Sequence, residues 1–448
     1  MAKEVGLVRK LGFWHIWAIG VGAVIGDGIF LLIGLGASEG GPVAIVMYLF
    51  AGLLFLIVMM ALSELAVGMP TAGSFYVWGR RMLGGGYGYV AATAYIAMNF
   101  IFLGSVSIAI GLISNWYFQW TASPYVSAII WALIWLSVVV GIVLAGVVIT
   151  GRAQLALVGI LCSIMVIFAI SGVASGRMEA ANFIPFMPYG MVGAFAALGM
   201  GAYAYMGPLT LLTTAGECKK ATDLPKGLFW ACMTFLIVYF LAQTVLIGLV
   251  HYTELGVMES PFTYAATQIW GGVAPAVMNT AAWIAAFTCL VGEVYCGSRL
   301  LYGLAEEKGL PSPFAWISRT TRVPWFSILA MYALGIVILV IGNIAVLEDF
   351  YVELCMMGCE AGMICWLILL VAAIKYKTKF AEEWQAMAWH LPGRSVLIPL
   401  AFVSSGFLLW GLFSADPMSI VYIAVFGGLM VLAYFGYARK RLTPKEYL

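Results

Sequence analysis

Charged side chains are scarce in this chain. Only 9% of its 448 residues are Asp, Glu, Lys or Arg, whereas 64% are hydrophobic, and the mean hydropathy is +1.03. A soluble domain carries about 25% charged residues and has no use for this much apolar surface. The composition therefore excludes a soluble protein and indicates a chain that crosses a bilayer, where each helical span needs about 20 apolar residues.

The residues that carry most membrane enzyme chemistry are also scarce. The three histidines lie at or near the ends of apolar stretches, and the eight cysteines are scattered without a Cys-x-x-Cys pair. Of the four aspartates only Asp27 lies inside an apolar stretch, whereas an intramembrane aspartyl protease needs a proton-sharing pair. We therefore expect no enzyme, no metal and no cofactor, and the net charge of +2 does not indicate a nucleic-acid partner.

The apolar stretches predict an all-α membrane protein with twelve transmembrane helices. A channel of this size would normally need a repeated pore element or a ring of subunits, and neither is visible in the sequence. The N-terminal residues 1–10 are short and polar, so we expect no cleaved signal peptide. The twelve expected spans are 12–35, 42–67, 86–114, 124–147, 153–174, 190–215, 226–250, 273–304, 325–345, 350–374, 396–414 and 418–437.

Basic residues are segregated into alternate loops between these spans. The loops on the side of both termini hold nearly all lysines and arginines. The opposite loops carry acidic residues, and their one basic residue is Arg177. The positive-inside rule therefore predicts that both termini are cytoplasmic. We expect the protein to lie in the inner or plasma membrane. The basic loops are expected to contact anionic lipid, and homodimer formation stays open.

Asp27 stands inside the first apolar stretch, within the glycine-rich run 20–30. A carboxylate at membrane depth is costly and usually faces a cavity, a partner charge or an ion pathway. The surrounding glycines weaken the helix, so the backbone can open and expose amide and carbonyl groups. The run predicts a broken helix at a transport site, although Asp27 as a cap on the broken backbone is the alternative.

The sixth span has a second interruption. Gly207 and Pro208 stand in its middle, and proline there removes a backbone hydrogen bond and clashes with the preceding turn. Spans 1 and 6 each open a block of five spans, and an odd number gives the blocks opposite topology. We therefore expect an inverted repeat with halves 1–180 and 181–380, followed by two peripheral spans and a cytoplasmic tail in 381–448.

Four stretches carry a family resemblance over nearly the whole chain. The chain resembles the amino acid–polyamine–organocation family of transporters in the glycine-rich motif of span 1, the end of span 2 with its loop, the loop after span 6 and the end of span 8. These stretches are 20–30, 61–78, 215–226 and 298–311. The resemblance implies five-plus-five inverted repeats with broken helices 1 and 6, and transport by alternating access.

Departures from the family pattern bear on the substrate. In related amino acid carriers a small hydroxyl residue stands between two glycines of span 1, but here Asp27 stands between Gly26 and Gly28. A fixed anion repels a substrate carboxylate and attracts an ammonium. Counting back from 309–311, Glu293 falls at a substrate-facing position of span 8. Two acids are thus expected near the substrate, although Glu293 facing a water-filled gap is the alternative.

The resemblance also implies several uncharged site residues. Asn99 on span 3 and Tyr203, Tyr205 and Met206 on span 6 match lining positions of the family. The faces of the tyrosines can hold an alkylammonium or guanidinium group by cation–π attraction.

Two glutamates are candidates for proton coupling. The span 5 lysine that serves coupling in some relatives is absent, since Gln154 aligns nearby and the expected position reads Leu161. Glu293 and Glu360 are acids on spans that flank the broken helices, and we expect them to set the pH dependence of transport. Glu64 and Glu217 are expected to be structural, with Glu217 and Lys219 stabilising the inner end of span 6.

These observations predict a secondary carrier, a permease or antiporter, for a small organic cation such as an amine, a polyamine or a cationic amino acid. The alternative is a neutral amino acid permease or exchanger in which Asp27 acts only in coupling. The sequence does not distinguish exchange from proton symport or facilitated diffusion.

Overall fold

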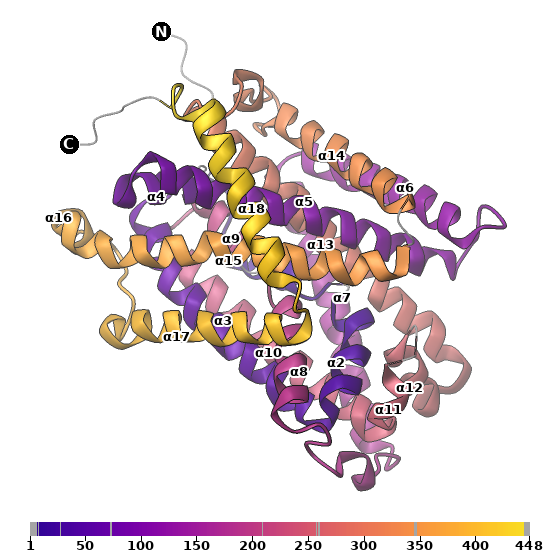
Figure 1. Cartoon of the computed structure of the whole chain (residues 1–448). Coiled ribbons are helices and arrows are strands. Elements are labelled where there is room, and N and C mark those ends of the chain that lie inside the picture. Colours follow the sequence, from indigo (N-terminus) through magenta and orange to yellow (C-terminus); the bar gives the residue numbers. More distant parts are fainter. Residues whose placement is uncertain are drawn as a thin grey trace.

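All regular structure in the described part of the chain is helical. The computed structural model describes residues 7, 9–26, 28–71, 74–207, 209–256, 258, 260–344 and 347–442. Its helices form a bundle in which α15 and α17 lie side by side and α18 crosses α15 (Figure 1). A single isolated β-bridge in the described ranges joins Leu11 and Cys218. The expected all-α membrane fold is confirmed.

The helices of the first half follow the expected spans, with short additional turns. In chain order they are α1 Phe13–Val24, the π-helical turn η1 Gly28–Leu32, α2 Ile33–Gly40, η2 Gly41–Val43, α3 Ala44–Gly68, α4 Ser74–Leu83, α5 Gly85–Asn115, α6 Pro124–Leu144, α7 Val147–Ala174 and η3 Ala180–Phe183.

The second half of the chain likewise consists of long helices joined by short helical turns. Its elements are α8 Gly190–Ala204, α9 Leu209–Thr213, η4 Thr214–Glu217, α10 Asp223–Leu249, α11 Tyr252–Leu255, α12 Pro261–Trp270, η5 Gly271–Val273, α13 Ala274–Glu306, η6 Ser312–Ala315, α14 Trp325–Ile344, α15 Leu347–Lys379, α16 Ala381–Gln385, α17 Arg394–Ala415, α18 Ser419–Ala433 and η7 Tyr434–Ala438.

Ten helical segments of the described chain are long and apolar enough to cross a membrane. Two shorter apolar helices, Phe13–Val24 and Trp325–Val340, lie where spans 1 and 9 are expected. The multi-pass character of the chain is therefore clear, and the count of twelve spans stays a prediction.

Both expected helix breaks are present. Helix α1 ends at Val24, and helical structure resumes at Gly28 as a π-helical turn. Helix α8 ends at Ala204, and α9 begins at Leu209. Because the residue before a proline avoids helical backbone angles, the break precedes position 208, which itself lies outside the described residues.

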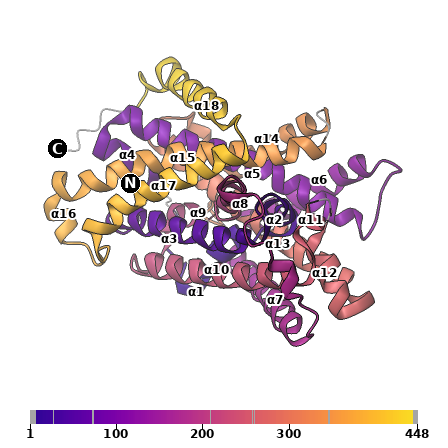
Figure 2. The ribbon, with the colours of Figure 1, turned by 60° about the horizontal axis from the view of Figure 1, so that its bottom comes forward.

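The halves of the two broken helices pack in crossed pairs. The second half of span 1, α2, packs along the first half of span 6, α8, and both are seen nearly end-on near the centre of the bundle in Figure 2. Conversely, α1 packs against α9, and Leu11 just before α1 donates a backbone hydrogen bond to Glu217 O (3.0 Å). Each side of the breaks thus combines one half from each broken helix.

The two breaks touch each other directly. A Cβ atom at Gly207 would lie 1.9 Å from Ala23 O and 3.0 Å from Val24 N. Both of those atoms are backbone, so no side-chain rotation could make room. Only glycine therefore allows the chain after α8 to pass this close to the end of α1.

Candidate functional site

A pocket lies between the two breaks and the helices α5 and α13. The described residues that line it are Ala23, Val24, Gly26, Gly28, Phe102, Val106, Tyr203, Ala204, Met206, Gly207, Cys289 and Glu293. Its wall is therefore built partly from backbone, because four of these residues are glycine or follow the end of a broken helix. Such a wall can offer peptide groups that are not used within a helix.

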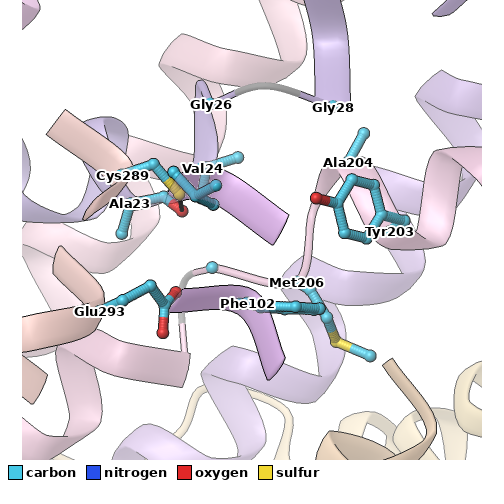
Figure 3. Close-up of a pocket in the computed structure, with 12 residues that line it drawn as sticks. Ala23, Val24, Gly26, Gly28, Phe102, Tyr203, Ala204, Met206, Cys289 and Glu293 are labelled. Carbon is cyan, nitrogen blue, oxygen red and sulfur yellow. Dashed lines mark hydrogen bonds between the residues drawn. The ribbon is translucent and has the colours of Figure 1, made fainter. Parts of the chain in front are cut away.

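Of the described residues that line the pocket, Glu293 alone carries a charged side chain. It lies on α13 and is fully buried. Figure 3 shows its carboxyl group and the hydroxyl of Tyr203 pointing from opposite sides toward the space between the broken helices. A buried carboxylate beside an aromatic ring can hold an ammonium group by charge and by cation–π attraction.

The remaining wall is apolar and sulfur-rich. The rings of Phe102 and Tyr203 meet edge to face with their centroids 5.4 Å apart. Met206 and Val106 add aliphatic surface, and Cys289 Sγ lies 3.7 Å from Ala23 O. Among its described lining residues, the pocket therefore combines one acidic side chain with a surface suited to the hydrocarbon part of a small molecule.

A tyrosine behind the pocket joins the two breaks. Tyr239 on α10 donates its hydroxyl to Val24 O (2.8 Å), and the same hydroxyl reaches Ala204 O at 3.4 Å. Val24 and Ala204 are the last residues of α1 and α8. One side chain thus contacts a carbonyl at the end of each broken half-helix.

Five of the residues predicted from the sequence lie together in the pocket wall, namely Gly26, Gly28, Tyr203, Met206 and Glu293. Asp27 lies outside the described residues, but it stands in the chain between two of these glycines. A Cβ atom at Gly28 would lie 2.8 Å from Cε1 of Tyr203, so the π-helical turn and the tyrosine are in close contact.

Three other predicted residues are buried but do not line this pocket. The ring of Tyr205 faces α10, with its centroid 5.1 Å from that of Tyr239. Asn99 donates to Tyr95 O (3.1 Å) and lies beside Gly297, one turn along α13 from Glu293. Glu360 is on α15, two residues before Gly362, a glycine close to Met98 and Met206.

Phe102, Val106 and Cys289 were not expected in the site. Their helical spacing carried a usable signal, because Phe102 and Val106 follow Asn99 by three and seven residues, and Cys289 precedes Glu293 by four. Residues three, four or seven apart share a helix face. The eight cysteines, all in the described ranges, form no disulfide, and no group of three or more potential metal ligands occurs among the residues described.

The two glutamates expected to be structural form ion pairs. Glu64, fully buried on α3, lies 2.8 Å from Arg394 Nε and accepts from Leu391 N (3.3 Å). Glu217 pairs with Arg299 of α13 (3.4 Å), a partner that the sequence did not indicate. Both pairs join segments that are far apart in the chain.

Comparison with known proteins identifies relatives along almost the full length. The family model described as amino acid permease matches residues 15–435. An uncharacterized amino acid permease of Bacillus subtilis (strain 168) is 28% identical, with 96% of this chain and 95% of the relative covered. The branched-chain amino acid permease BcaP of Lactococcus lactis subsp. cremoris (strain MG1363) is 27% identical, with 95% of this chain and 93% of the relative covered. The lysine-specific permease LysP of the same organism is 24% identical, with 98% of this chain and 91% of the relative covered.

Proposed function

Because the chain belongs to the amino acid permease family, we propose that it is a secondary carrier that moves a small organic cation across the membrane by alternating access. The substrate class comprises amines, polyamines and cationic amino acids. The observation that carries this proposal is the fully buried Glu293 in the wall of a pocket whose other described lining residues are uncharged. The family and the relatives of this chain are permeases, so the protein is a transporter and not an enzyme.

In this proposal the substrate ammonium binds between Glu293 and the ring of Tyr203. Asp27 adds a second negative charge, since its chain neighbours Gly26 and Gly28 both line the pocket. The hydrocarbon part of the substrate packs against Phe102 and Met206. An anionic site in a membrane interior favours a cation over a zwitterion, because the carboxylate of an amino acid meets repulsion.

Alternating access would use the crossed pairs of half-helices. The pair α2 and α8 would close one side of the pocket, and α1 with α9 would close the other. This arrangement supports the inverted repeat that we proposed for residues 1–180 and 181–380, with 381–448 peripheral. With both termini in the cytoplasm, the pair α1 and α9 faces the cytoplasm, and proton movement through Glu293 or Glu360 would couple transport to the proton gradient.

A neutral amino acid is the second candidate substrate. The apolar wall and the resemblance to a branched-chain amino acid permease favour it. In that case free peptide groups at the breaks would bind the substrate carboxylate, Glu293 would bind its ammonium, and Asp27 would serve only in coupling.

Competition by an amine and its parent amino acid separates the two candidates. A thermal-shift screen of purified protein first identifies ligands, because a ligand that binds only the folded state raises its apparent stability. Uptake of the best ligand into proteoliposomes is then challenged with matched pairs at equal concentration, namely cadaverine with lysine and 3-methylbutylamine with leucine. Stronger inhibition by the amines is the expected result. Stronger inhibition by leucine than by 3-methylbutylamine would replace the first candidate with the second, whereas stronger inhibition by lysine than by cadaverine would narrow the first candidate to cationic amino acids.

A further inference from the structure

A buried ion pair lies on one side of the pocket. Arg299 on α13 is fully buried, and its Nε and Nη2 atoms lie 3.4 Å from the two carboxylate oxygens of Glu217. Tyr295 donates its hydroxyl to the same carboxylate, and its ring lies under the guanidinium at 3.8 Å. The side chains of both charged partners are at most 2% exposed.

This cluster fastens the second half of broken span 6 to α13. Glu217 is the last residue of η4, which continues from α9, and Cys296 of α13 also contacts Thr210 O of α9 (3.3 Å). The segment before α1 is attached to the same point, because Leu11 N donates to Glu217 O and Lys219 N donates to Leu11 O (2.8 Å). One carboxylate-bearing residue therefore connects α13 with the halves of both broken helices on this side.

The position of the cluster along α13 relates it to the pocket. Arg299 follows Glu293 by six residues, which is about 9 Å along a helix axis at 1.5 Å per residue. The cluster thus lies beyond Glu293, on the side of the pocket where α1 begins. A substrate leaving the pocket on this side would have to separate α9 and η4 from α13.

We propose that Glu217 and Arg299 form a latch that closes this side of the pocket and must open for the substrate to pass. The proposal rests on the carrier function proposed above. An ion pair suits such a role because its two states differ in hydration. While the interface is dry, each charge depends on the other and separation is costly. Once water enters, both charges are solvated and the attraction between them becomes weak. Apolar contacts lack this second stable state, since water disfavours them.

Side-specific labelling of Cys289 tests the latch. Cys289 lines the pocket, so a small membrane-impermeant cationic methanethiosulfonate reaches it only through an open side. Reagent is added to either face of oriented membrane vesicles, and the label on Cys289 is measured by mass spectrometry. In Arg299→Gln, labelling from the face where α1 begins is expected to rise about tenfold relative to the other face, a shift of ~1.4 kcal/mol in the equilibrium between the two states.

Two further variants separate a latch from general stability. Glu217→Gln/Arg299→Gln removes both charges and leaves no unpaired buried ion, so it is expected to fold and to show the same shift in labelling. Arg394→Gln breaks a different Arg–Glu pair, which joins α3 to the first residue of α17, and should leave the ratio between faces unchanged. An unchanged ratio in the double variant, or an equal shift in Arg394→Gln, would overturn the latch.

The same experiment distinguishes this proposal from the proposed function. Labelling of Cys289 from each face reports the opening of the pocket and requires no substrate. If the ratio shifts as expected but no amine or amino acid protects Cys289, the latch stands and the assignment of the pocket as the substrate site fails.

Discussion

Glu293 is the side chain on which the proposed substrate chemistry depends. It is fully buried, lies in a pocket wall and points toward the space between the two broken helices (Figure 3). A carboxylate in this place stabilises a cationic group more strongly than it would in water, because the surrounding dielectric is low. The resemblance to known carriers predicts a substrate-facing position for Glu293, and the structure has this residue in the pocket wall. Its contact with substrate stays a prediction.

Replacing Asp27 should show whether a second acid contributes to the site. Asp27→Asn is expected to abolish or greatly weaken uptake, because loss of a desolvated partner of an ammonium costs on the order of 2–5 kcal/mol of binding. The measurement is uptake by proteoliposomes at matched protein content, with size-exclusion profiles as the folding control. Near-normal uptake by well-folded Asp27→Asn would remove Asp27 from direct substrate contact.

Glu293 and Glu360 should differ in how they affect the pH dependence. Protonation of a site carboxylate removes the charge that holds an ammonium, so cation binding by the parent should weaken as pH falls. Glu293→Gln is expected to flatten the pH profile of uptake and to weaken binding, whereas Glu360→Gln should flatten the profile with less effect on binding. Uptake and equilibrium binding measured across pH for the three proteins provide the test.

Retention of the parental profile by both glutamine variants would exclude them as coupling groups. The protein would then be better described as an exchanger or a facilitator. A profile that changes only in Glu293→Gln would assign coupling to the pocket itself and leave Glu360 with a structural role.

The sequence was a better guide to which residues lie near the pocket than to the direction in which their side chains point. Gly26 and Gly28 could be predicted because glycines around a membrane acid are unusual. Glu293 could be predicted because the family resemblance puts its position on span 8 toward the substrate. Tyr205 could not be placed, since it follows the end of α8, where the backbone no longer keeps a helical period, and its ring faces Tyr239 instead of the pocket.

At the scale of helices, the broken spans were predictable and their partners were not. Glycine and proline act on the local backbone, so their effects are visible in a short stretch of sequence. By contrast, Glu217 and Arg299 are 82 residues apart and Tyr239 is 215 residues from Val24. Such contacts depend on how helices pack, and a single sequence does not specify which charged residues will meet.

Gly207 should be intolerant of even one added methyl group. Gly207→Ala would place Cβ 1.9 Å from Ala23 O, so the two breaks would have to separate. We expect a loss of about 3 kcal/mol or more of stability or a misfolded protein, because backbone atoms cannot yield as side chains do. The matched control is Gly159→Ala on α7, where a Cβ would have no atom within 4 Å.

Thermal unfolding in detergent and uptake after reconstitution check both glycine variants. The control change should alter stability by about 1 kcal/mol or less, since alanine is the better helix former and meets no neighbour. Equal behaviour of the two variants would mean that the breaks are not held in the contact seen here.

At the scale of the whole molecule, hydropathy gave a good account of the helices. The expected spans 86–114, 124–147 and 396–414 correspond to α5, α6 and α17 within a few residues. Short helices such as α4 and α12 were not expected, because they are too short for a span and lie in segments that hydropathy assigns to loops. The twelve-span count, the inverted repeat and the orientation remain predictions.

The ion pair between Glu64 and Arg394 should stabilise the molecule without affecting substrate choice. It joins α3 to the first residue of α17, and neither partner is among the residues that line the pocket. Glu64→Gln is expected to lower stability by on the order of 3 kcal/mol, because Arg394 loses its charged partner and Leu391 N a strong acceptor. The check is a lower melting temperature together with an unchanged ranking of competing substrates, and a changed ranking would contradict this purely structural role.

The central claim is that the pocket between the breaks holds the substrate ammonium at Glu293, and protection of Cys289 tests it most directly. Native protein is alkylated with increasing concentrations of a transported substrate, and the label is compared with that on Cys162, a partly exposed thiol of α7. The account predicts that substrate protects Cys289 alone, at the concentration that half-saturates uptake, and that Glu293→Gln needs at least ~30-fold more, the equivalent of 2 kcal/mol. Saturating substrate that leaves Cys289 labelling unchanged in the native protein would contradict it.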